Sequence, residues 1–164
     1  MKTHHRRQAG FSIVEVMVAL VVLAVGMLGI ASLYVTTLRS SGSAMSRMQA
    51  VNLATDLADR IRANRFAGEA YAGTAAEVEC LGIDKNCTQE QMAANDLYMW
   101  QLQIDELLPG SVTDSEGTVA YRAGTSGDPD TYTITVTWKE LGTSDAEAVS
   151  EGKLSYAMTM LIDP

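Results

Sequence analysis

Apolar residues form one long run near the start of the chain, and a periodic pattern follows it. From Phe11 to Val35 nearly every position is apolar, and Glu15 is the single charged side chain. This run exceeds the roughly 20 residues that a helix needs to cross a bilayer. The run therefore predicts a membrane-spanning helix. An ionisable group inside such a helix is unfavourable enough to indicate a function for Glu15.

The helical pattern continues beyond the apolar run without a helix breaker. Apolar residues recur at helical spacing, with polar residues on the opposite side: Ala50, Leu53, Ala54, Leu57 and Ile61 against Asn52, Asp59 and Arg62. One helix from Phe11 to about Arg65 would be roughly 80 Å long at 1.5 Å per residue. Its first half is apolar all round, whereas its second half needs a soluble domain to cover one stripe.

Residues 66–87 predict a loop, and a second helix is predicted to follow it. Thr88 and Gln91 have the spacing of a capping box, so the helix should begin at Thr88. Pro109 and Gly110 should end it. The residues expected to line its apolar face are Ala93, Leu97, Trp100, Ile104 and Leu107.

Three later segments, 118–122, 131–138 and 154–162, predict strands. The second alternates apolar residues with threonines, and the third also has alternating apolar positions: Tyr132, Ile134, Val136 and Trp138, then Leu154, Tyr156, Met158, Met160 and Ile162. The economical arrangement is an α+β fold in which a small antiparallel sheet packs on the amphipathic half of the long helix. Trp100 and Trp138 are then expected in the core rather than in a ligand site.

The charges indicate how the chain is oriented and which partners it lacks. Lys2, Arg6 and Arg7 precede the apolar run and favour a cytoplasmic N-terminus, which places the rest of the chain outside. The 12 basic and 20 acidic side chains give a net charge of −8. Without the three leading cations, nine basic and twenty acidic side chains remain, a net charge of −11. This balance argues against nucleic-acid binding by the body of the domain.

Three arginines stand close together where the long helix should end: Arg60, Arg62 and Arg65. They would form either a local basic patch or a solvated helix end, where cations suit the helix dipole. We favour the second interpretation.

Histidine and cysteine limit the possible chemistry. Both histidines, His4 and His5, precede the apolar run, so the remainder of the chain has no Ser-His or Cys-His pair and no histidine metal ligand. Cys80 and Cys87 are the two cysteines, and in an extracytoplasmic domain they predict a disulfide. A zinc site with two thiols alone is the weaker alternative. We expect no metal, no cofactor and no enzymatic activity.

The beginning of the chain resembles the type IV prepilin signal: a basic leader, Gly10, Phe11, and Glu15 as the fifth residue after the glycine. The resemblance implies that a prepilin peptidase cuts between Gly10 and Phe11 and methylates the new amino group of Phe11. It also implies an assembly role for Glu15, which would pair with the Phe11 amine of a neighbouring subunit. Helical spacing alone would equally allow pairing within one chain.

Cleavage before the apolar run would retain it, whereas a secretory signal peptide loses its apolar region. The predicted parts are therefore a cleaved leader over 1–10, a membrane and assembly segment over 11–35, and a periplasmic domain over 36–164. We expect a single-pass protein of the inner membrane that later joins a pilus.

Downstream segments resemble the minor pilins of the PilV type, or type IV pilus modification proteins. The matching segments are Leu57–Asn64, Asp96 with Leu97 and Trp100, Leu108–Gly110, and Ile134–Trp138. The resemblance implies the type IV pilin fold. It also implies a minor pilin that joins other minor pilins and a tip adhesin, primes pilus assembly, and supports adhesion from the fimbrial tip. A minor pseudopilin of type II secretion is the alternative, but the downstream matches favour the pilus.

A calcium site is a further possibility that the resemblance raises, because some pilin relatives bind calcium. Asp128 and Asp130 lie in the loop over 125–130. This loop lacks the regular acidic spacing of a calcium-binding loop, so we favour a solvated turn.

Overall fold

The structure is a computed structural model that describes residues 10–80, 86–110, 115–125, 127–139 and 152–163. The chain divides into two compact units, one ending at Ser40 and the other beginning at Ser41, and each is described by itself. The leader predicted over 1–10 lies outside the described residues except for Gly10.

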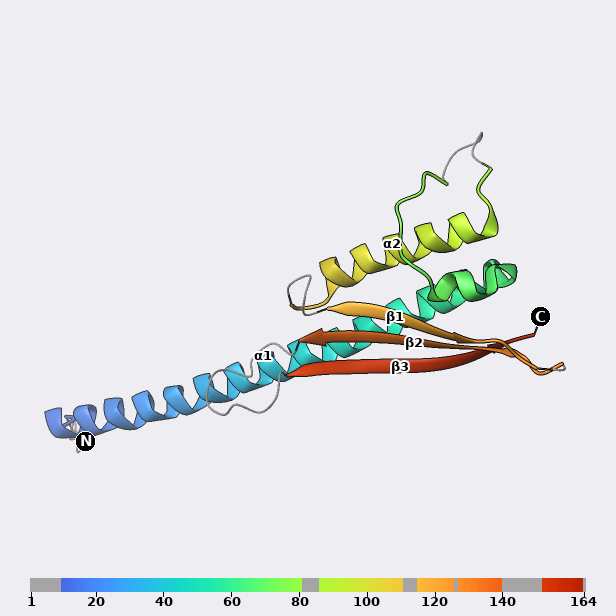
Figure 1. Ribbon diagram of the computed structural model, residues 1–164. Coiled ribbons are helices and arrows are strands. Elements are labelled where there is room, and N and C mark those ends of the chain that lie inside the picture. The colour runs from blue at the N-terminus through green and yellow to red at the C-terminus, as the bar shows by residue number, and fades with distance from the viewer. Residues whose placement is uncertain (1–9, 81–85, 111–114, 126, 140–151, 164) are drawn as a thin grey trace, which may run out of the picture. The chain divides into compact units, whose positions relative to one another are not determined.

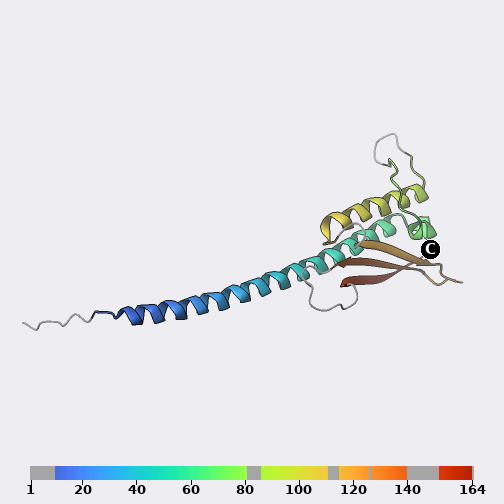
Figure 2. The ribbon, with the colours of Figure 1, turned by 60° about the vertical axis from the view of Figure 1, so that its left-hand side comes forward.

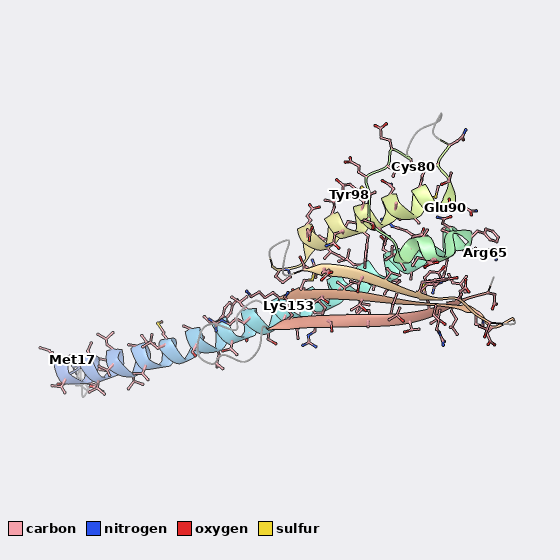
Figure 3. All side chains as sticks on the ribbon, in the orientation of Figure 1. Met17, Arg65, Cys80, Glu90, Tyr98 and Lys153 are labelled. Carbon is pink, nitrogen blue, oxygen red and sulfur yellow. A yellow bond between two sulfur atoms is a disulfide. The ribbon has the colours of Figure 1, made fainter. Side chains whose placement is uncertain are left out.

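The first unit is built from the beginning of α1 (Ile13–Ala63), an uninterrupted helix of 51 residues that confirms the predicted long helix. Every side chain from Phe11 to Ser41 is exposed, Met17 among them (Figure 3). A helix that is apolar all round is typical of a segment that is surrounded by an apolar environment, such as a membrane. Within the described ranges, α1 is the one helix long and apolar enough to cross a bilayer.

The second unit contains the rest of α1 together with a shorter helix and a sheet (Figures 1 and 2). The predicted stripe of α1 is buried, namely Ala50, Leu53, Ala54, Leu57 and Ile61. Asn52, Asp59 and Arg62 on the other side are exposed, as the periodicity predicted. Burial of this stripe couples the helix to the domain, since each buried leucine or isoleucine side chain contributes about 1.5–3 kcal/mol.

The segment after α1 is not the simple loop that the sequence predicts over 66–87. Its first part forms η1 (Arg65–Ala72), a 3₁₀ helix broken at Gly68, whose φ is 53°. Ala67 and Tyr71 are buried and hold this helix against the core. Two anchors in eight residues, with a glycine between them, give too little periodicity for the sequence pattern to indicate a helix.

The second helix, α2 (Gln89–Leu107), begins with the predicted capping box. The Gln91 backbone N–H donates to Thr88 Oγ1 at 3.2 Å, and the Thr88 N–H donates to Gln91 Oε1 at 2.9 Å. Four of the five residues predicted to line the apolar face are buried. The prediction for Leu107 is wrong, since this residue is 46% exposed. The helix ends there, and the following Leu108 turns into the core instead.

The sheet has three antiparallel strands in the order β1-β2-β3. They are β1 (Glu116–Arg122), β2 (Asp130–Lys139) and β3 (Lys153–Ile162), each at a predicted position. In β2 the predicted residues Tyr132, Ile134, Val136 and Trp138 are buried. The register places Ile134 between Val119 and Met158, so the middle strand supplies the centre of the core. This arrangement confirms the predicted α+β fold, a long N-terminal helix packed on a small antiparallel sheet.

Candidate functional site

The segment predicted to carry processing lies immediately before α1. Gly10, Phe11 and Ser12 are non-helical and exposed, and Phe11 is 84% exposed. The Ser12 carbonyl accepts hydrogen bonds from the N–H groups of Glu15 at 3.1 Å and Val16 at 3.2 Å, which begins the helical ladder. The Gly10–Phe11 peptide bond therefore lies in exposed chain outside the helix.

Glu15 lies in the first turn of α1, where the helix dipole favours a negative charge. Its side chain is exposed and borders one shallow hollow together with Phe11 and Ala19. The two residues predicted to interact thus occupy the same side of the segment, although Phe11 itself precedes the helix. A carboxylate in this position is available to a cation from its own chain or from a neighbour.

A polar cluster at the far end of α1 joins three segments of the second unit. The Tyr71 hydroxyl donates to Asp96 Oδ2 at 2.7 Å, and Arg60 Nη1 lies 3.5 Å from Asp96 Oδ1. Asn64 Nδ2 donates to the Gln89 carbonyl at 2.9 Å. Burial, with the bond to Asp96 as a second cause, raises the pKa of Tyr71 well above its usual value. The phenol therefore stays protonated and remains a donor at neutral pH.

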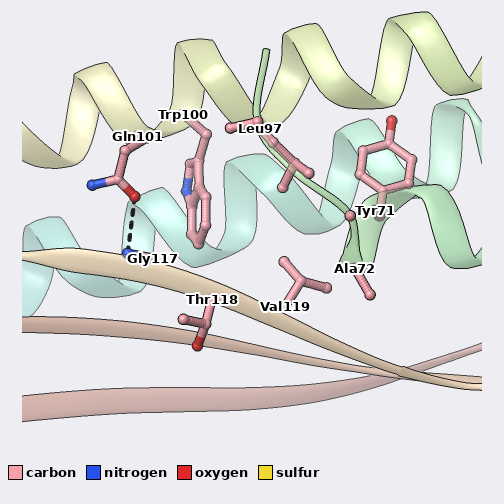
Figure 4. A pocket seen from close by; sticks show the side chains of 10 residues that line it. Tyr71, Ala72, Leu97, Trp100, Gln101, Gly117, Thr118 and Val119 are labelled. Carbon is pink, nitrogen blue, oxygen red and sulfur yellow. Dashed lines mark hydrogen bonds between the residues drawn. The ribbon is translucent and has the colours of Figure 1, made fainter.

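Trp100 connects α2 to both of its neighbours in the core. Its indole Nε1 donates to the Leu53 carbonyl of α1 at 2.9 Å, and the residue is 1% exposed. A Cβ at Gly117 of β1 would overlap the Trp100 ring and Ile104, so only glycine lets the strand approach α2 this closely. The Gly117 N–H donates to Gln101 Oε1 at 3.1 Å (Figure 4).

A cavity of about 240 Å³ lies beside this contact and is lined by η1, α2 and β1. Tyr71, Leu97, Trp100 and Val119 contribute its apolar wall (Figure 4). Its lining contains no ionisable side chain other than the phenol of Tyr71, whose raised pKa keeps it neutral. The cavity therefore provides no acid–base pair for catalysis.

The three arginines considered at the end of α1 do not gather into a basic patch. Arg60 pairs with Asp56 at 2.9 Å as well as with Asp96, and Arg62 pairs with Asp59. Arg65 instead lies over the Phe66 ring, 4.6 Å from its centroid. Acidic partners thus neutralise two of the three cations, in agreement with the predicted solvated helix end.

Cys80 and Cys87 form the predicted disulfide, with their Cα atoms 5.6 Å apart. The bond closes a short loop whose residues 81–85 lie outside the described ranges. By the chain-entropy model such a loop contributes about 2–3 kcal/mol to stability. The chain before Cys80 is held to α2, because the Val78 N–H donates to Asn95 Oδ1 at 3.3 Å.

The loop considered for calcium is organised by Asp130, whose two oxygens already accept hydrogen bonds. Tyr121 Oη donates to Oδ2 at 2.9 Å, and the Gly124 N–H donates to Oδ1 at 2.8 Å. The bond to Asp130 raises the pKa of the Tyr121 phenol. In the described part of the chain, no group of three or more acidic, histidine or cysteine side chains is placed to bind a metal ion.

Most residues that carry the resemblance to minor pilins meet in the core of the second unit. The buried ones are Leu57, Ala58, Ile61, Asn64, Leu97, Trp100, Leu108, Ile134, Val136 and Trp138. These matches therefore report the fold, because buried positions are constrained by packing. Two residues escaped the sequence pattern: Tyr71, which is buried in this core, and the half-buried Gln101 on α2. Gln101 is polar, and Tyr71 shares helical spacing with Ala67 in a helix of only eight residues, so neither stood out in the apolar pattern.

Comparison with known families finds a match for the N-terminal segment and a second match for the chain that follows it. The model of the prokaryotic N-terminal methylation motif matches residues 5–31, and the model described as type IV pilin Tt1218 matches residues 32–98. No curated protein and no solved structure matches the chain.

The methylation motif implies processing by a prepilin peptidase and a pilus context, and with the apolar helix it fits a membrane-anchored pilin. Pilins are structural proteins and not enzymes. The two matched segments adjoin one another and contain the long helix α1, and the small sheet follows them along the chain. The chain is therefore a type IV pilin-like protein.

Proposed function

We propose that this chain is a minor pilin of the type IV pilus that helps to prime assembly at the tip. The observation that carries the proposal is the N-terminal segment. It combines an accessible Gly10–Phe11 bond with a helix of exposed apolar residues whose first turn contains Glu15. Cleavage at this bond would leave a membrane-anchored subunit that begins at Phe11, is methylated there, and carries residues 36–164 in the periplasm.

The assignment as a minor pilin rests on the segments that resemble the PilV type. The proposed partners rest on the same segments. Other minor pilins and a tip adhesin are the partners that this resemblance implies. The acidic body of the domain makes a nucleic acid an unfavourable partner. The outer face of the sheet presents the threonine hydroxyl groups of β2, and Thr133 and Thr159 form a hydrogen bond of 3.3 Å there.

Glu15 supplies the mechanism of incorporation in this proposal. Cleavage creates an ammonium group at Phe11, and in a bundle of such helices Glu15 of one subunit meets that group on the next. Loss of one partner of a buried ion pair costs roughly 3–5 kcal/mol, because the other charge stays unpaired. Pairing of this kind also fixes the relative height of neighbouring helices.

We expect Glu15→Ala and Glu15→Gln to leave the chain cleaved and its Cys80–Cys87 disulfide formed, but to deplete it from pili. The amount of protein in sheared pili is compared with the amount in the membrane fraction by immunoblotting. Met17→Ala is the matched control, since Met17 is exposed on the same segment but carries no charge. If Glu15→Ala entered pili as well as Met17→Ala does, the assembly role would be refuted.

Deletion of the gene separates the pilus from the secretion alternative. A minor pilin that primes assembly should reduce the number of surface pili, counted by electron microscopy, while the major pilin remains in the membrane. Expression of the full chain should restore the pili. Normal piliation combined with defective secretion of exoproteins would instead favour the minor pseudopilin.

A further inference from the structure

The free edge of β1 faces the cavity that η1, α2 and β1 line. β1 pairs with β2 along one side, and on its other side the Gly117 N–H donates to Gln101 Oε1 at 3.1 Å (Figure 4). In an antiparallel sheet, the backbone groups of every second residue point to the same side of a strand. The N–H and carbonyl of Val119, two residues later, therefore also point away from β2, toward the cavity that Val119 lines.

The backbone N–H and carbonyl of Val119 have no hydrogen-bond partner in the part of the chain that the structure describes. Gln101 engages the equivalent donor at Gly117, so this edge has one position that is filled from within the chain and one that is open. Unpaired backbone groups on a strand edge are a template for pairing with another chain. One residue of an extended peptide supplies both the acceptor and the donor that Val119 needs.

The cavity has room for the side chain of that peptide residue. Residues that lie opposite each other in a sheet direct their side chains to the same face, which for Val119 is the face that packs against the core. The cavity there has a volume of about 240 Å³, and its apolar wall is formed by Leu97, Trp100 and the Tyr71 ring. Since an apolar cavity of about 150 Å³ already holds benzene, this one accepts a phenyl ring.

The charges around the cavity favour a cation on the peptide. The bordering segments, 71–78 and 116–119, contain no lysine or arginine, and neither does α2. Glu77 and Glu116 are exposed and lie within two residues of positions that line the cavity. Neither forms a salt bridge among the described residues. A basic residue close to the apolar one would therefore complement the rim of the site.

We propose that the second unit binds an extended peptide segment of another protein at this edge. The segment pairs with the backbone of Val119, places a large apolar side chain in the cavity, and carries a lysine or arginine nearby. Main-chain hydrogen bonds supply affinity in such strand addition, and the pocket supplies specificity. The site lies wholly within the second unit, so the inference does not depend on the minor-pilin proposal.

A defined peptide tests the site on the full chain in detergent micelles. The probe is the five-residue peptide lysine-threonine-phenylalanine-threonine-lysine with blocked ends. Titrated into the nitrogen-15-labelled chain, it should shift the Val119 amide signal in a two-dimensional NMR spectrum. Alanine in place of the phenylalanine, or a methyl group on the phenylalanine backbone nitrogen, should each raise the Kd about tenfold. Equal affinity after N-methylation would refute strand pairing.

A matched pair of variants tests the cavity. Ala75 is exposed and lines the cavity, whereas Ala76 is exposed but does not line it. Ala75→Phe should fill the space and raise the Kd about tenfold, and Ala76→Phe should leave the Kd unchanged. The urea midpoint and the Cys80–Cys87 disulfide report whether both variants are folded. Equal affinities of the two folded variants for the probe would overturn the proposal.

Two further substitutions test the edge donor and the charge. Val119→Pro removes the N–H that faces the cavity but no bond to β2, a position that tolerates proline, and should abolish the response to the probe. Glu116→Lys should weaken binding of the lysine peptide and strengthen binding of its counterpart with glutamate at both ends. An unchanged Kd in folded Val119→Pro, or an unchanged preference in Glu116→Lys, would contradict the proposed site.

Discussion

Gly10→Val is expected to leave the chain uncleaved, with its N-terminal leader attached and its amino group unmethylated. A β-branched side chain next to the Gly10–Phe11 bond would crowd the bond in the site of the peptidase. The intact mass of the membrane-extracted protein measures the result directly. Mature protein that begins at Phe11 in cells expressing Gly10→Val would show that the peptidase tolerates a β-branched residue before the bond it cuts.

The structure makes this experiment interpretable, because Gly10 has no neighbouring atom within 4 Å of the position that a Cβ would occupy. Valine at this position therefore disturbs no packing within the chain, and a processing defect reports contact with the peptidase. Gly26→Val is the matched control. Gly26 also has open space around its Cβ position, but it lies well inside α1, so its substitution should leave cleavage normal.

Trp100→Ala is expected to destabilise the second unit by about 3–5 kcal/mol, the range for loss of a buried aromatic side chain. The substitution removes the ring against which Gly117 packs and the hydrogen bond to the Leu53 carbonyl. It also enlarges a cavity that already holds about 240 Å³. Whole domains are stable by only about 5–15 kcal/mol, so the loss should be visible in urea unfolding of the full chain in detergent micelles.

Two further variants separate the contributions of Trp100. Trp100→Phe keeps most of the apolar ring but loses the indole donor, so it should cost roughly 1–2 kcal/mol. Tyr98→Ala, on the outer side of the same helix (Figure 3), should change stability little. If Trp100→Ala unfolded at the same urea concentration as Tyr98→Ala, α2 would not depend on this residue for its packing.

Strong periodicity explains why most of the fold was predictable from the sequence. The stripe of α1, the capping box of Thr88 and Gln91, and the alternation in β2 each agree with a single secondary structure. The N-terminal motif was readable for a different reason. The motif is defined by residues at fixed positions close together in the sequence, so it can be recognised without any knowledge of tertiary contacts.

The features that the sequence did not reveal depend on contacts between distant segments. η1 is a helix because Ala67 and Tyr71 find a place in the core, and no local pattern shows that place. Leu107 and Leu108 are neighbours of the same type, and only the end of α2 decides which of them is buried. The pairing of Tyr71 with Asp96 likewise joins residues 25 positions apart.

The Cys80–Cys87 bond also has a consequence for the order in which the chain matures. Disulfides form in the oxidising periplasm, whereas the basic leader keeps Gly10 on the cytoplasmic side in the proposed topology. Each covalent change therefore records an event on a different face of the membrane. A molecule with a closed disulfide and an intact leader has already exported its domain but has not yet been cleaved by the peptidase. The two modifications together therefore report the order in which export and cleavage occur.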